Sequence, residues 1–278
     1  MKTISRFFSF LVLILTCFLF SCSDNDNISD KKLLPSQIIQ NYRLTSSSPG
    51  VSVETINKYT YDDSNRLEKI SHTYTATEGS ERIVNTRSTL IKYDAESRVS
   101  EVHITTSENS AIGVVSIEKY TYSGDKITRN KDGKDIAIIQ ASDKNIQVTD
   151  LIVGESQSST NYQLDINGNV IEYRYTSDYS NHRRYNFDQK NGIFKQVNTP
   201  RWFLITQGEF LGYQSENRTK EFVASDDNWV EFTYNEMQYN NDDYPVIVKK
   251  IPSPDWIGTS STTMTVEYIQ AKAVYKNE

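Results

Sequence analysis

The three tryptophans are the residues whose chemistry best suits direct contact with a ligand. Trp202, Trp229 and Trp256 carry flat, amphipathic rings of the kind that stack against sugar rings. Trp256 stands in PSPDWIG, where Pro252 and Pro254 keep the segment irregular and favour its exposure. The alternative interpretation is that all three pack a thin core. The sequence therefore names these tryptophans as candidate stacking residues and leaves core packing open.

The acids and serines do not form a catalytic pattern. GESQS (154–158) is one residue short of the G-x-S-x-G nucleophile elbow, and its surroundings are strand-like rather than strand-turn-helix. The chain has 36 Asp and Glu, but nothing singles out a pair for glycoside hydrolysis. Walker and dinucleotide-binding loops are missing from the sequence. We therefore expect no catalytic residue and a protein that is not an enzyme.

The residues that could hold a metal are scattered. His72, His103 and His182 are the only histidines, and no two share a strand or helical spacing. DINGN (165–169) and DNDN (24–27) are rich in oxygen ligands, but neither has the Gly at position six and the Glu at position twelve of a complete calcium loop. We expect no metal and no cofactor, and we interpret these stretches as a hairpin turn and a tether.

The N-terminus carries a targeting signal. Lys2 and Arg6 precede the apolar run FFSFLVLILTCFLF (7–20), which is shorter than the ~20 residues that span a bilayer. The run ends in Leu19-Phe20-Ser21-Cys22, which resembles the lipobox of bacterial lipoproteins. The resemblance implies a signal peptide over 1–21 and lipid attachment at Cys22, which would hold the domain on a membrane. An ordinary secretory signal cleaved nearby is the alternative.

Charge and cysteine content narrow the partners. The chain has 30 Lys and Arg against 36 Asp and Glu, so loss of Lys2 and Arg6 with the leader changes the net charge from −6 to −8. An acidic domain has no basic footprint for nucleic acid. Both cysteines, Cys17 and Cys22, lie in the signal region, so the mature domain has none for disulfides. Residues 22–35 suit a polar tether, and its acids resemble the surface-export signal of Bacteroides-type lipoproteins, which implies display at the outer-membrane surface.

A hairpin unit recurs along the chain. YTYDDSNRLEKI (59–70) is repeated with variation at 91–102, 120–130, 162–173, 185–197 and 239–250. Asp62 opens the turn by bonding the backbone two residues on, and Asn65 stands where a positive φ is expected. Asp165 and Gly168 take the matching places, whereas Ser97 fits less well and Gly124 predicts a tighter turn. The arginines that follow the turns, such as Arg66, are expected to make weak, solvated ion pairs.

The elements that must position these residues are strands. The 18 Tyr and the abundant Thr, Val and Ile favour an all-β fold, a long antiparallel meander in a curved or rolled sheet. The predicted strands are 36–45, 51–61, 66–76, 83–93, 98–106, 112–122, 126–131, 135–141, 145–152, 160–165, 169–176, 182–187, 219–224, 229–239, 245–251 and 262–275. TPRWFLITQGEFLG (199–212) predicts one short helix packed on the sheet, with Thr199 as N-cap, Pro200 at the first position and Gly212 as the stop. No linker divides the rest, so 36–278 is interpreted as one domain.

The units Y-x-Y-D followed by N-R-L resemble those of YD-repeat (Rhs-like) lipoproteins of the Bacteroides type, a group that includes domains of unknown function. The resemblance covers most of 50–251, implies a β-meander lipoprotein and transfers no catalytic residue. The leading hypothesis is a lipid-anchored, non-enzymatic surface lipoprotein whose repeats present a binding or structural surface for a glycan or another cell-surface protein. A lipid- or lipoprotein-handling carrier with an apolar groove is the second hypothesis, and a glycan hydrolase is the third.

Overall fold

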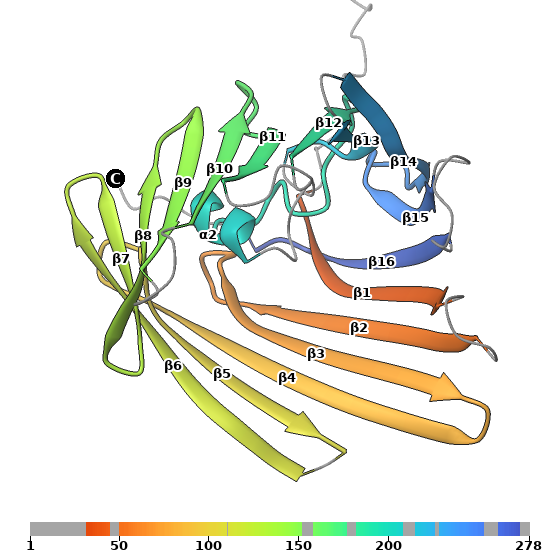
Figure 1. Cartoon of the computed structure of the whole chain (residues 1–278), viewed down its shortest axis with the longest axis horizontal. Helices are drawn as coiled ribbons and strands as arrows, with labels where there is room; N and C mark the ends of the chain where they lie inside the picture. Colours follow the sequence, from red (N-terminus) through yellow and green to blue (C-terminus); the bar gives the residue numbers. More distant parts are fainter. Residues whose placement is uncertain are drawn as a thin grey trace, which may run out of the picture. The chain divides into compact units, whose positions relative to one another are not determined.

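The computed structural model describes residues 32–44, 50–109, 111–151, 158–176, 182–207, 215–225, 228–252 and 261–272. The described part of the chain forms one compact unit that begins at Lys32. Its strands follow one another around a single closed antiparallel barrel in the order of the sequence (Figure 1). No helix in these ranges is both long enough and apolar enough to cross a membrane.

The elements agree closely with those predicted. The first eight strands are β1 (Leu33–Leu44), β2 (Val51–Tyr61), β3 (Leu67–Glu78), β4 (Glu81–Tyr93), β5 (Val99–Glu108), β6 (Ala111–Ser123), β7 (Lys126–Lys131) and β8 (Lys134–Ala141). The others are β9 (Asn145–Asp150), β10 (Ser159–Leu164), β11 (Val170–Tyr175), β12 (Arg183–Phe187), β13 (Arg218–Ser225), β14 (Asn228–Tyr239), β15 (Pro245–Pro252) and β16 (Thr262–Gln270). The helix α2 (Arg201–Thr206) lies between β12 and β13.

The predicted all-β meander with one short helix is confirmed, and the sheet closes on itself. β1 pairs with β2 on one side and with β16 on the other, so the first and last strands join. β1 begins at Leu33, inside the range interpreted as tether, because Leu34 and Pro35 are buried there. Closure removes the unpaired edges that an open meander would leave at both ends.

Alternation along each strand separates the inside of the barrel from the outside. On β2, Val53 and Tyr59 are buried, whereas Ser52, Glu54 and Lys58 between them are exposed. The inward side chains form one apolar cluster that runs around the barrel from Leu34 on β1 to Val266 on β16. Successive side chains point to opposite faces of a strand, so this pattern fixes the register of the whole sheet.

The repeated turns form as the sequence predicts. Asn65, Ser97 and Gly168 have φ values of 59°, 64° and 82°, and the pairing shifts by one residue beside each turn. These are the marks of a type I turn followed by a left-handed bulge residue. Gly124 has φ 60° at the first position of the two-residue loop between β6 and β7, which is the tighter turn expected there.

The tyrosines of the repeats tie neighbouring hairpins together. The hydroxyl of Tyr93 donates to the backbone carbonyl of Leu67 at 2.8 Å, and that of Tyr122 donates to the carbonyl of Val99 at 2.8 Å. In both cases the acceptor is the first strand residue after the preceding turn. The repeat units at 91–102 and 120–130 therefore each make a hydrogen bond to the hairpin before them, in addition to forming their own turns.

The arginines after the turns form the predicted ion pairs and also stack on tyrosine rings. Arg66 bonds both oxygens of Asp62 through its backbone and side chain, and its guanidinium also lies 4.2 Å above the ring of Tyr93. Arg98 repeats this arrangement with Asp94 and Tyr122 at 4.4 Å. The exposed fractions of the two side chains are 19% and 45%. Arg66 is consequently a packing residue as well as a surface charge.

The prediction for the helix needs a correction at its start. Pro200 rather than Thr199 is the N-cap, without a side-chain capping bond, and the helix ends at Thr206. The hydroxyl of Thr199 instead accepts the backbone N–H of Leu67 at 2.8 Å. The N–H of Leu67 is buried and cannot pair with water, so it takes the hydroxyl of Thr199 as its acceptor, which is the physical reason for the difference. Gly212 lies outside the described residues.

Candidate functional site

The segment between β12 and β13 is a hairpin turn enlarged into a plug. In the ordinary repeat, Asp62 accepts from the backbone N–H of Arg66, and the Asp62 N–H donates to the Arg66 carbonyl. Asp188 makes the same two bonds with Asn217, at 3.1 and 3.0 Å. The described residues between Asp188 and Asn217, which are 189–207 and 215–216, are here called the plug segment. They occupy the place of the three residues of a normal turn.

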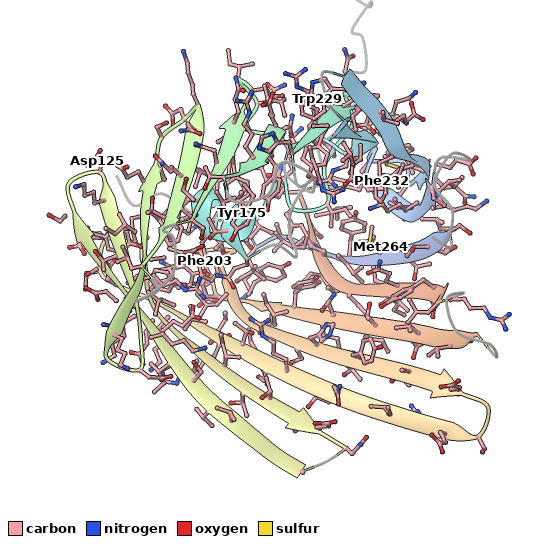
Figure 2. The ribbon with its side chains drawn as sticks, in the orientation of Figure 1. Asp125, Tyr175, Phe203, Trp229, Phe232 and Met264 are labelled. Atoms are coloured by element: carbon pink, nitrogen blue, oxygen red, sulfur yellow. The ribbon has the colours of Figure 1, made fainter. Side chains whose placement is uncertain are left out.

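The apolar side chains of the plug segment are buried at the barrel end that carries the Asp turns. They join the barrel core, and Ile205 and Phe203, which Figure 2 labels, are fully buried. Ile193 and Phe194 are buried before the helix, and the ring of Phe194 meets that of Tyr59 edge-on at 5.4 Å. This apolar body is what closes the end of a wide barrel whose own strands are largely polar on one face.

Polar contacts fix the plug segment to several turns. The backbone N–H of Asn198 donates to the Asn65 carbonyl at 3.0 Å, and its side-chain amide donates to the Ser64 carbonyl at 2.6 Å. At the β14–β15 turn, the amide of Asn191 donates to the Asp242 carbonyl at 2.8 Å. Bonds to separate hairpins hold the segment at defined points around the rim.

A cavity of about 480 Å³, here called the plug cleft, lies where the plug segment meets the β8–β9 turn and β10. Its lining is partly apolar and partly polar or charged. The apolar lining is formed by Ala141, Ile146, Leu164, Phe194, Val197, Trp202 and Leu204. The exposed and half-buried polar lining, here called the rim, is formed by Ser142, Asp143, Lys195, Asn198, Arg201 and Ser215, and the buried Thr199 also lines the cavity. Cavities that bind small ligands commonly combine an apolar lining with a few polar groups.

Trp202 lies in this cleft, half-buried. Its ring packs against Tyr120 of β6 at 5.5 Å with an interplanar angle of 54°, and against Phe203 edge-on at 5.7 Å. These contacts hold the indole in one orientation. The sequence-based candidate Trp202 is thus both a packing residue and part of a cavity wall, so the two interpretations of this residue are compatible.

Two cations flank the indole on the same segment. Arg201 is exposed, and its guanidinium lies against the β10–β11 turn, because a Cβ added at Gly168 would come within 1.5 Å of its Nη1. The Lys195 ammonium donates to the side chain of Asn191 at 2.6 Å. Both groups are hydrogen-bond donors at the rim, and Asp143 supplies a carboxylate there.

The other predicted stacking residues are not brought to this cleft. Trp229 lies on β14, and the guanidinium of Arg184 stands 4.2 Å over its ring (Figure 2). One face of that indole is therefore already occupied. Trp256 and the proposed lipid-attachment residue Cys22 lie outside the described residues.

A second cavity, the open-end cleft, lies away from the plug. It has a volume of about 720 Å³ and is lined by His72, Tyr74, Asn85, Thr86, Arg87, Thr106, Ser107, Glu108, Gly113 and Val114. Figure 1 shows β3 to β6, which carry these residues, extending well beyond the level of α2. Val114 is 74% exposed, so an aliphatic surface faces solvent there.

Buried acids in the barrel wall are the feature that the sequence analysis missed. Glu118 and Glu221 are 2% and 4% exposed. Glu118 receives two bonds from Arg129, at 2.6 and 3.0 Å, and one from the hydroxyl of Tyr120 at 3.0 Å. Glu118 stands two residues before Tyr120 in a strand, and this period of two is the signal that could have placed it on the inner face.

The pKa shifts of two buried carboxyl groups show that neighbouring cations keep them ionised. Burial raises the pKa of Glu221, but Arg218, Lys250 and Arg183 outweigh it, so the net direction is downward. Glu172 follows the same rule, with Arg184 and Arg174 lowering its pKa against burial. These carboxylates are ionised at neutral pH.

The histidines make ordinary contacts. His72 bonds the side chain of Asn57 at 2.7 Å, and His103 pairs with Glu101 on the same strand. Within the described ranges, no group of three or more His, Cys, Asp or Glu side chains is arranged to hold a metal ion.

Comparisons with known proteins give structural likeness without a family. No protein-family model and no curated protein matches the chain. A porin-like protein from Bacteroides uniformis is similar over 84% of this chain and 98% of its own, with 14% identity and a TM-score of 0.39. A porin-like protein from Bacteroides vulgatus is similar over 85% and 98%, with 12% identity and a TM-score of 0.37. A beta-barrel-like protein from Brucella abortus, of a domain of unknown function, is similar over 86% and 98%, with 9% identity and a TM-score of 0.36.

Proposed function

We propose that the chain is a lipid-anchored, non-enzymatic binding protein of the bacterial envelope and that its plug cleft binds a saccharide. The observation that carries the proposal is the placement of Trp202 in the wall of a cavity of about 480 Å³ with a polar rim. An indole held by its neighbours offers a flat surface to a sugar ring, and Arg201, Lys195 and Asp143 offer donors and acceptors for sugar hydroxyls.

The outer wall of the barrel supports anchoring by lipid rather than by the strands themselves. Outward positions on β2 carry Ser52, Glu54, Lys58 and Thr60, all exposed. A barrel that spans a bilayer needs an outward apolar band ~25 Å tall. The lipobox-like sequence that ends at Cys22 then provides the attachment, and the acids after it suit display at the outer-membrane surface.

The state of the carboxylates supports binding rather than hydrolysis. A glycosidase needs one carboxylic acid whose pKa is raised so that it can donate a proton. Each carboxyl of the described residues whose pKa clearly departs from its ordinary value is shifted downward, namely Asp63, Asp94, Glu101, Glu172 and Glu221. These groups act as fixed negative charges that hold cations in place.

The test is a glycan-array screen of the chain from residue 23 onward, followed by calorimetric titration of each hit. Replacing Trp202 by Ala should weaken binding up to about tenfold, because packing on an aromatic ring contributes on the order of 0.5–1.5 kcal/mol beyond the area that it buries. Trp229→Ala is the matched control, since that indole lies on β14 under Arg184. Retention of every hit by the Trp202 variant would refute the assignment of the cleft.

Attachment is tested separately. The Cys22→Ala variant should leave the membrane fraction for the soluble envelope fraction, because the acyl chains would be lost. Unchanged fractionation would rule out the lipoprotein part of the proposal while leaving the saccharide site intact.

A carrier of apolar molecules is the second candidate, and the open-end cleft favours it. Its volume of about 720 Å³ and the exposed Val114 at its rim suit an aliphatic group. Displacement of an environment-sensitive fluorescent fatty acid, lost on Val114→Asp and kept on Trp202→Ala, would support this function over saccharide binding.

A further inference from the structure

A group of three cations shares one carboxylate on the inner wall of the barrel. Glu221 of β13 receives Nη1 of Arg183 at 2.6 Å on one oxygen. Its other oxygen receives Lys250 Nζ at 3.2 Å and Arg218 Nη1 at 3.4 Å. The hydroxyl of Thr233 lies 3.4 Å from that same oxygen. We call Arg183, Arg218, Glu221 and Lys250 the basic cluster.

The cluster faces the inside of the barrel. Arg218 lies 3.7 Å over the ring of Tyr185, which belongs to the buried core. Arg183 has the same parity on β12 as Tyr185, so both project inward. Arg183 and Lys250 both approach the ring of Phe232, at 5.2 and 5.9 Å (Figure 2). Three strands, β12, β13 and β15, thus supply one compact group of charges, and β14 supplies Phe232 and Thr233 beside it.

The charges of this group do not balance. Three permanent or near-permanent cations meet one carboxylate, so among the described residues the cluster carries two uncompensated positive charges. The groups that shift the pKa of Glu221 are Arg218, Lys250 and Arg183, with burial opposing them. Like charges held this close repel one another, and a negatively charged group from outside would relieve the repulsion.

Unpaired polar atoms accompany the excess charge. Nε and Nη2 of Arg218 are buried without a hydrogen-bond partner, and so is Oδ1 of Asn235, whose amide nitrogen donates to the Arg218 carbonyl at 2.6 Å. Most buried polar atoms in proteins are paired, so three such atoms beside one cluster indicate interactions that the described residues do not complete. Lys250 and Arg183 remain 43% and 26% exposed, and solvent or a ligand reaches the cluster past them.

We propose that the basic cluster is an anion-binding site for a carboxylate or sulfate group, bound between Arg183 and Lys250. The group comes either from a free oxyanion or from an acidic saccharide, in which case Asn235 Oδ1 accepts a hydroxyl and Phe232 lies beneath the ring. The site is distinct from the plug cleft, because no residue of the basic cluster lines that cleft. The chain has a net charge of −6. The inward-facing cations of the basic cluster form a local positive region that attracts anions to the inside of the barrel.

The experiment is calorimetric titration of the chain from residue 23 onward, at constant ionic strength, with three probes: sodium sulfate, sodium galacturonate and neutral galactose. Sulfate and galacturonate should bind and galactose should not. Lys250→Met should weaken both anions about tenfold, the usual effect of losing one charge-assisted bond. Lys249→Met is the matched control, because the neighbouring lysine points to the outer face of β15, towards Glu236, and should leave the affinities unchanged.

Glu221→Gln makes the test sharper because it predicts a gain. Removal of the only carboxylate should tighten anion binding several-fold, and added sulfate should raise the melting temperature of this variant more than that of the parent. If Glu221→Gln does not fold, Arg183→Gln replaces it and should weaken binding as Lys250→Met does. Binding of galacturonate well above sulfate identifies an acidic saccharide, and equal binding identifies a free oxyanion. Absence of anion binding by the folded parent, or equal losses in Lys249→Met and Lys250→Met, would overturn the proposal.

Discussion

Replacing Thr199 by Val tests whether the plug segment is joined to the barrel wall by one buried hydroxyl. The hydroxyl accepts the N–H of Leu67 at 2.8 Å and meets the hydroxyl of Tyr93 at 2.9 Å. Leu67 is fully buried, so water cannot replace the lost acceptor. Tyr93 keeps its bond to the Leu67 carbonyl at 2.8 Å, which leaves a single orphaned N–H.

The expected cost follows from that single group. A buried donor left without a partner costs ~1–3 kcal/mol. For a domain of this size each kcal/mol lowers the melting temperature by about 2–4 °C, so Thr199→Val should melt roughly 2–12 °C below the parent. Chemical unfolding followed by circular dichroism measures the free energy directly.

Thr199→Ser is the matched control because it keeps the hydroxyl and loses one methyl group, for which ~0.8 kcal/mol is expected. A second measurement concerns Tyr93, whose pKa burial raises to about 12 while the bond from Thr199 lowers it. Thr199→Val should therefore raise the pKa of Tyr93 further in an alkaline absorbance titration. Equal stability of the Val and Ser variants would show that the hydroxyl does not join plug and wall.

Three further predictions concern charge and backbone geometry. Arg66→Ala should cost about 1 kcal/mol and Arg98→Ala less than half of that, because Arg66 is 19% exposed and Arg98 45%; urea unfolding measures both. Gly168→Ala should cost on the order of 1–2 kcal/mol, because φ is 82° and a Cβ would strike Arg201; adding Arg201→Ala should recover only the steric part. Against the effect of burial, the cations around Glu221 hold its folded pKa below its ordinary 4.5, so its stabilisation is present above that pH and is lost as the pH falls through the folded pKa. Glu221→Gln should therefore flatten the fall in unfolding free energy as the pH falls below 4.5.

Each of these has an outcome that would contradict it. Equal losses of unfolding free energy in Arg66→Ala and Arg98→Ala would mean that stacking on the tyrosine rings does not stabilise the turn. Gly124→Ala, at φ 60° with open space around the new Cβ, measures backbone strain alone, and a cost equal to that of Gly168→Ala would exclude the clash with Arg201. Parallel pH curves for Glu221→Gln and the parent would show that this carboxylate is not held ionised by its cations.

Local sequence predicted the hairpins because a hairpin is a local structure. The Asp that opens the turn, the Asn or Gly that takes the positive φ and the alternating strand residues all act within about ten positions of one another. Asn65, Gly124 and Gly168 have positive φ as predicted, and the strand ranges agree to within about three residues except for the last, predicted to run to 275 and observed to end at Gln270. The helix was predicted from its apolar body, and only its ends were wrong.

The candidate site depended on contacts that no local pattern contains. Trp202 could be proposed from its residue type, but its cleft needs Ile146 and Leu164 from distant strands. The enlarged turn could not be recognised, because Asp188 finds its closing partner at Asn217, 29 positions later, rather than four. Local sequence predicts Thr199 as a helix cap, because its actual partner, the N–H of Leu67, lies 132 positions away in the sequence.

Residues close together in the sequence set where the chain turns, which faces of its strands are apolar and which side chains follow each turn. The pairing of β1 with β16, the closure of one end by the plug segment and the convergence of three cations on Glu221 appear only in the folded chain. The physical reason is the range of the forces involved. Turn geometry is set by neighbouring residues, whereas closure of the barrel and the gathering of charges on its inner wall are set by the twist and register of all sixteen strands together.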